Sequence, residues 1–148
     1  MKKFVRAVCL LMALVMLMVT PAFAAEIPQT RASDFFAMTS TYLDQVSSTK
    51  MEIWFDVCGV GTMQEIGVKT IKMQRSSDQT NWTTVQTYSR DDYSQMIDTN
   101  TTAHADCVTY TGSSGYYYRA YVTFYAKDSS GTGQNSYYTA TKYMHPNP

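Results

Sequence analysis

The sequence has few of the residues from which catalytic and metal sites are usually built. Its 148 residues include two histidines and three cysteines. They form no H-x-x-x-H pair and no C-x-x-C pair, and the EF-hand pattern, the glycine-rich phosphate loop and the nucleophile elbow are also missing. These absences argue against the common metal-dependent, redox and nucleotide-dependent enzymes. We expect neither a metal nor a cofactor.

Long apolar runs are missing except at the N-terminus. Basic residues there precede an uncharged run over 9–19, and Ala22-Phe23-Ala24 places small residues at the two positions that signal peptidase reads. The run is shorter than the roughly 20 residues that a spanning helix needs. We therefore predict a signal peptide over 1–24, cleaved near Ala24, and a secreted protein that has no membrane contact after cleavage. A membrane anchor is the alternative.

Charge is sparse and nearly balanced. The chain has twelve Lys and Arg and twelve Asp and Glu residues, and loss of the expected signal peptide leaves a mature net charge of −3. A mildly acidic chain with scattered charge is a poor ligand for nucleic acid and for anionic lipid. Aromatic residues make up 14% of the chain, which excludes disorder of the polar, highly charged kind.

Cysteine is scarce in the expected mature chain, where only Cys58 and Cys107 remain. An even pair of cysteines in an exported protein favours one disulfide. Two buried free thiols are the alternative.

The mature chain is typical of short strands separated by turn formers. Apolar side chains alternate with polar ones over 51–58, the signature of a half-buried strand. A strand also fits 35–46, where a helix capped by Ser33 or Asp34 is the alternative. Residues 90–104 are expected to form a loop or ragged edge. The expected strands are 35–46, 51–58, 68–76, 82–89, 105–112, 116–126 and 137–144.

These segments predict a flexible lead-in over 25–34 and one all-β domain over 35–145. Seven strands at this spacing favour a single antiparallel β-sandwich.

Two segments resemble the middle of bacterial fibronectin type III domains. Residues 71–88 (IKMQRSSDQTNWTTVQTY) have an Arg-Ser strand end, an Asp-containing turn and a Trp opening the next strand, and 110–126 (YTGSSGYYYRAYVTFYA) lead into a Tyr-x-Tyr-Arg strand. The usual proline before that strand is absent. The matching residues are Arg75, Ser76, Asp78, Trp82, Gly112, Tyr116, Tyr118 and Arg119.

The resemblance implies a fibronectin type III or immunoglobulin-like sandwich and no particular activity. The overall layout also resembles small secreted proteins without an assigned function from spore-forming Gram-positive bacteria. In the implied fold, strands 51–58 and 105–111 share a sheet and run antiparallel. Cys58 and Cys107 would then lie side by side at the strand ends, where a disulfide would join them.

The strand over 116–126 divides by parity into two faces. One face is expected in the core, and its Tyr116 stands where sandwiches often carry a tyrosine corner. The opposite face offers exposed aromatic rings and an arginine, residue types that stack on sugars and are enriched at protein interfaces. Ordinary cross-strand packing is the alternative. The expected core residues are Tyr116, Tyr118, Ala120, Val122 and Phe124, and the candidate binding residues are Tyr117, Arg119, Tyr121 and Tyr125.

A few other residues have weaker functional interpretations. His104 and Asp106 are the only histidine and carboxylate that lie close together in the sequence. They could serve a small hydrolase, but a solvated pair in a loop is the favoured interpretation. Trp54 is either a ligand platform or a ring covered by a loop. Acidic residues over 91–98 are more often solvated than bound to calcium.

The sequence therefore favours a non-catalytic extracellular module that binds a protein or a glycan. An accessory structural protein without a dedicated ligand is the alternative, and a small hydrolase is the third.

Overall fold

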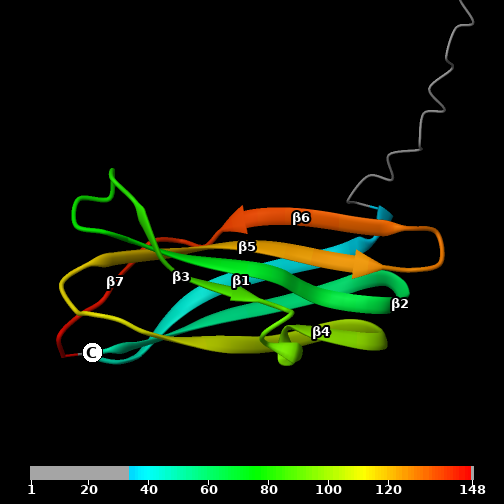
Figure 1. Ribbon diagram of the computed structural model, residues 1–148, viewed down its shortest axis with the longest axis horizontal. Coiled ribbons are helices and arrows are strands. Elements are labelled where there is room, and N and C mark those ends of the chain that lie inside the picture. Colours follow the sequence, from blue (N-terminus) through cyan, green and yellow to red (C-terminus); the bar gives the residue numbers. More distant parts are fainter. Residues whose placement is uncertain (1–33, 148) are drawn as a thin grey trace, which may run out of the picture.

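The computed structural model describes residues 34–147 and shows an all-β chain (Figure 1). The expected signal peptide over 1–24 lies outside the described residues. Within the described part, no helix is long and apolar enough to cross a membrane. A 3-10 turn, η2 (Ser94–Met96), precedes β4. The strands are β1 (Phe36–Ser47), β2 (Lys50–Ser76), β3 (Thr83–Ser89), β4 (Ile97–Thr111), β5 (Tyr117–Lys127), β6 (Thr132–Tyr138) and β7 (Lys142–Tyr143).

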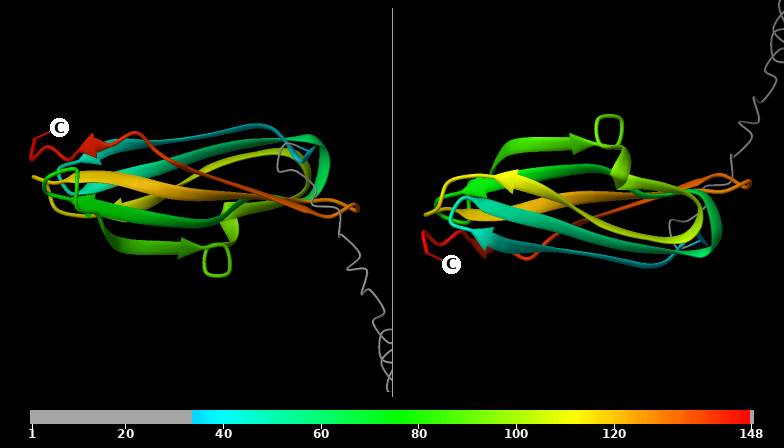
Figure 2. Two further views of the ribbon diagram at one scale, coloured as in Figure 1. Left: turned by 90° about the horizontal axis from the view of Figure 1, so that it is seen from above. Right: turned by 90° about the horizontal axis from the view of Figure 1, so that it is seen from below.

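The seven strands form one antiparallel sheet organised around β2, which is 27 residues long. The N-terminal half of β2 pairs with β1 on one side and β4 on the other. Its C-terminal half pairs with β3 and β5, and β5 in turn pairs with β6 and β7. The sheet is curled, so β1 and β3 lie on opposite sides of the molecule (Figure 2).

The two strands predicted over 51–58 and 68–76 are in fact one continuous strand. Gly59-Val60-Gly61 does not end the strand, because the backbone stays extended there and the Val60 N–H donates to the Phe35 carbonyl at 3.1 Å. The pairing with β4 shifts across this stretch. A side chain at Gly59 would lie 2.9 Å from the Gly61 carbonyl oxygen, so glycine is required for the close approach at this bend. The described sheet is thus a single curled one.

Two other boundaries differ from the prediction. β4 begins at Ile97, inside the segment expected as a loop, because the longer β2 supplies partners as far as Gly67 for the additional residues. The predicted last strand is divided into β6 and β7, and β6 starts at Thr132 within the turn-rich stretch. The prediction of a strand rather than a helix at the start of the domain is confirmed by β1.

The core lies inside the curl and follows the predicted alternation. From β2 it receives Met51, Ile53 and Val57, each without exposed area. From β5 it receives Val122 and Phe124, which are equally buried. Burial of an aliphatic side chain of this size stabilises the fold by about 1.5–3 kcal/mol.

The hydroxyl-to-backbone contact expected of Tyr116 is made by Tyr118 instead. The Tyr118 hydroxyl donates to the Ser113 carbonyl at 2.8 Å and accepts the Ser113 N–H at 3.1 Å. Tyr118 is fully buried on the inward face of β5. Tyr116 precedes the strand, packs at the edge of the core and lies beside the Arg75 guanidinium at 4.5 Å.

Candidate functional site

The outward face of β5 carries three of the four candidate binding residues in half-exposed positions. Tyr117, Arg119 and Tyr121 are partly buried, whereas Tyr118 and Ala120 between them are fully buried. This is the alternation that a pleated strand produces. The three side chains therefore share one face of the sheet.

Arg119 is held by aromatic rings from two other segments. Its guanidinium carbon lies 4.1 Å from the centre of the Trp82 ring and 4.2 Å from that of Tyr138. Its Nε donates a hydrogen bond of 2.8 Å to Oε1 of Gln74. Each cation–π contact at a partly exposed site contributes about 0.5–1 kcal/mol. Because Trp82 leads into β3 and Tyr138 ends β6, the two rings reach Arg119 from opposite edges of the β2–β5 pair.

The turn after β2 positions Trp82. The Asp78 carboxylate accepts the N–H groups of Thr80 and Asn81, each at 2.8 Å. Hydrogen bonds from Asn81, and then from Thr80, hold the pKa of Asp78 well below its ordinary value. The indole Nε1 of Trp82 donates to the Gln79 carbonyl at 3.0 Å. The turn and the ring orientation are therefore both fixed by local hydrogen bonds.

Tyr121 extends this arrangement along β5. Its ring centre lies 4.7 Å from that of Tyr138, which is 51% exposed. Tyr117 instead packs against Tyr143 of β7, with ring centres 5.0 Å apart. The group of Trp82, Arg119, Tyr121 and Tyr138 is named the Arg119 surface below.

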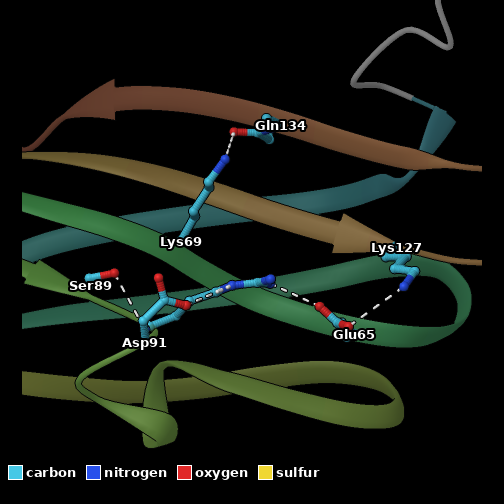
Figure 3. Close-up of polar contacts among 7 residues, drawn as sticks. Glu65, Lys69, Ser89, Asp91, Lys127 and Gln134 are labelled. Carbon is cyan, nitrogen blue, oxygen red and sulfur yellow. Dashed lines mark hydrogen bonds and ion pairs between the residues drawn. The ribbon is translucent and has the colours of Figure 1, made fainter.

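Tyr125 is outward-facing, but it does not belong to an exposed patch. Only 8% of it is exposed, because the Arg90 guanidinium covers its ring at 4.5 Å. Arg90 also forms a 2.9 Å ion pair with Glu65, whose other carboxylate oxygen is 3.8 Å from Lys127 Nζ (Figure 3). Tyr125 is therefore part of a packed ionic cluster, and the prediction that it is exposed is wrong.

A shallow hollow of about 310 Å³ lies beside this ionic cluster. It includes Asp91 from the segment weighed as a calcium loop, but neither Asp92 nor Asp98 lines it. Over residues 34–147 no group of three or more His, Cys, Asp or Glu side chains is placed to hold a metal ion.

The predicted disulfide is not formed, and both Cys58 and Cys107 are half-buried free thiols. β2 and β4 are antiparallel neighbours as expected, but Cys58 is opposite Ala103 and Cys107 is opposite Trp54. An offset of four residues along a strand separates them by about 13 Å, whereas a disulfide requires Cα atoms within about 7 Å. Because β4 begins at Ile97, Cys107 lies well inside the strand and not near its start, where it was expected.

His104 and Asp106 lie on the same face of β4 without contacting each other through a hydrogen bond. Nε2–H of His104 donates to the Gln95 carbonyl at 2.8 Å, and the ring packs 5.5 Å from that of Phe55. The Asp106 carboxylate accepts the N–H of Cys107 at 2.7 Å. The His104 contact ties η2 to β4, and the carboxylate does not orient the imidazole.

The sequence did not place Trp82 and Tyr138 in the candidate site. Trp82 is far from β5 in the sequence, and Tyr138 is at the end of the next strand, so the strand order and the β5–β6 register bring them to Arg119. An available signal was the position of each ring at the start of a predicted strand, 82–89 for Trp82 and 137–144 for Tyr138. Comparison of the chain with known protein families and with curated proteins gave no match.

Proposed function

We propose that the protein is a non-catalytic extracellular binding module that recognises a partner through the Arg119 surface. The observation that carries this proposal is the fixation of Arg119 by two rings and one hydrogen bond. A side chain that is ordered before binding loses less entropy when a ligand arrives. Trp, Tyr and Arg are also the residue types that dominate the binding energy of protein interfaces.

A protein partner fits this surface better than a glycan. Sugar rings stack on open faces of aromatic rings, and Arg119 already occupies one face of Trp82 and of Tyr138. Lys72 neighbours Tyr121 across the strand pair and adds positive charge. A partner with acidic and aromatic residues would complement this surface.

The proposal includes a sandwich fold of fibronectin type III or immunoglobulin-like type. In support of it, the β1–β2–β4 and β3–β2–β5–β6 neighbours, which belong to one curled sheet, have the strand order that the two sheets of that fold would have. The hydroxyl of Tyr118 also bonds back to Ser113, as in a tyrosine corner. Secretion rests on the N-terminal sequence pattern alone.

The test compares a double substitution in the Arg119 surface with a substitution of an exposed tyrosine outside it. Immobilised wild-type protein is used to capture partners from culture medium and cell-surface extract, and it is also applied to a glycan array. The double variant Tyr121→Ser/Tyr138→Ser should lose the captured partner. Tyr137→Ser is the control, because Tyr137 is 41% exposed and lies next to Tyr138 on β6, but opposite the inward-facing Val122. Equal capture by all three proteins would refute the proposal, and binding only on the array would replace a protein partner by a glycan.

A further inference from the structure

A second pair of aromatic rings lies on the outward face of β1 and the N-terminal half of β2. The rings of Tyr42 and Trp54 are stacked with planes only 8° apart and centres 6.2 Å apart. Nε1 of Trp54 donates to the Glu52 carboxylate at 3.0 Å, which fixes the indole. Tyr42 is 54% exposed and Trp54 is half-buried, so the pair remains open to a ligand.

Asp56 lies next to this ring pair on the same face of β2. Asp56 and Trp54 are two positions apart along the strand, so their Cα atoms are about 6.6 Å apart. Its cross-strand neighbours are the small residues Ser40 and Ala105. Among residues 34–147 the Asp56 carboxylate has no hydrogen bond or ion pair. Tyr42, Trp54 and Asp56 are named the Trp54 surface.

The surrounding cations leave the Asp56 charge uncompensated. Lys142 is already paired with Asp44 at 2.6 Å. Lys50 points to the same face but lies at the start of β2, six positions from Asp56. This surface therefore combines stacked rings and a free carboxylate without a cation that belongs to them.

The rest of the molecule contains an example of that combination with a cation bound to it. The three arginines within the described part of the chain, Arg75, Arg90 and Arg119, each stack on at least one aromatic ring at 4.1–4.5 Å. Arg90 combines a tyrosine ring with a carboxylate, since it covers Tyr125 and pairs with Glu65. The Trp54 surface presents the same two groups without the guanidinium.

We propose that the Trp54 surface is a second binding site, which accepts an arginine side chain from a segment of a partner protein. A guanidinium is planar, so it can lie on the ring pair while its N–H groups reach the Asp56 carboxylate. A lysine ammonium provides the charge but not the flat face. A neutral sugar would use the rings and leave the carboxylate uncompensated. This site is distinct from the Arg119 surface and does not depend on it.

Tryptophan fluorescence tests this site directly. The chain has two tryptophans, so the variant Trp82→Phe leaves Trp54 as the single reporter and keeps an aromatic ring against Arg119. A tri-arginine peptide with blocked ends should shift the Trp54 emission saturably. The matched tri-lysine peptide should bind at least about tenfold more weakly. Cellohexaose serves as the neutral glycan probe.

Two substitutions in this background locate the site. Asp56→Asn should weaken tri-arginine binding about tenfold, because the charge-assisted hydrogen bonds are lost. Asp92→Asn removes the same charge from an exposed residue after β3 and should leave the affinity unchanged. Equal affinity for the two peptides, equal effects of the two substitutions, or no shift at all would each overturn the proposal. A shift with cellohexaose that survives Asp56→Asn would also overturn it, in favour of a glycan site.

Discussion

The Arg119 surface and the Trp54 surface are built from the same kinds of residue but differ in how their charges are satisfied. In the Arg119 surface the cation is supplied by the chain and is already covered by Trp82 and Tyr138. In the Trp54 surface the rings are stacked on each other, and the Asp56 carboxylate has no cation among the described residues. The contacts that order Arg119 stabilise the fold and also reduce the entropy lost when a partner binds, whereas the Asp56 carboxylate gains its energy only when a ligand binds.

The largest loss of stability is expected from substitution of Gly67, where the two halves of the sheet meet. Its φ is +152°, and a Cβ there would lie 2.1 Å from the Met96 carbonyl oxygen. Gly67→Ala should therefore lower the free energy of unfolding by at least about 3 kcal/mol, measured by urea titration. Gly61→Ala is the control, because a methyl group at Gly61 would have no neighbouring atom within 4 Å. Similar losses for both variants would show that the junction is not tightly constrained.

A smaller effect on stability should distinguish the Arg119 surface from the Trp54 surface. Arg119→Lys keeps the charge but removes the planar contact with two rings and the Gln74 hydrogen bond, and it should cost about 1–2 kcal/mol in unfolding free energy. Asp56→Asn should change the same quantity by less than about 0.5 kcal/mol. If Asp56→Asn is as destabilising as Arg119→Lys, the Asp56 carboxylate contributes to folding and the contrast between the surfaces is lost.

The smallest effect concerns the chemistry of Cys107, which lies opposite Trp54. Burial, followed by the carboxylates of Glu52 and Asp106, raises the pKa of this thiol. A raised pKa keeps the thiol protonated to higher pH, so iodoacetamide should modify folded Cys58→Ser protein at pH 8 more slowly than the urea-unfolded protein. Glu52→Gln should increase the folded rate. Failure of wild-type protein to react at either cysteine in urea without reductant would instead show that the thiols are oxidised.

The alternation of side chains was enough to predict that the segments of β2 and β5 are extended and which of their side chains face inward. The continuity of β2 was not predictable, because Gly59-Val60-Gly61 resembles a turn until β4 and Phe35 are known to bond with this stretch. The distance between Cys58 and Cys107 likewise depends on how β2 and β4 are aligned. The spacing of the two cysteines in the sequence does not determine that alignment. Local pattern indicates which residues form strands, while tertiary partners decide where strands end and how they align.

The candidate site also has a part that local pattern predicts and a part that depends on tertiary partners. Parity placed Tyr117, Arg119 and Tyr121 on the outward face, but it could not show that Arg90 covers Tyr125, since Arg90 comes from a connection between β3 and η2. Nor could it bring Trp82 and Tyr138 to Arg119. These contacts depend on strand order, which residue periodicity does not specify.

The length of β2 has a consequence for the order in which the chain folds. The β1–β2 and β2–β3 contacts are local and can form early, but β5 pairs with β2 only after a long intervening segment has been placed. Folds dominated by such distant pairings reach the native state in milliseconds to seconds. Until β5 arrives, one edge of an apolar strand has unpaired N–H and C=O groups that another chain can bind. Refolding yield should therefore fall as protein concentration rises, even though the finished sheet covers that edge.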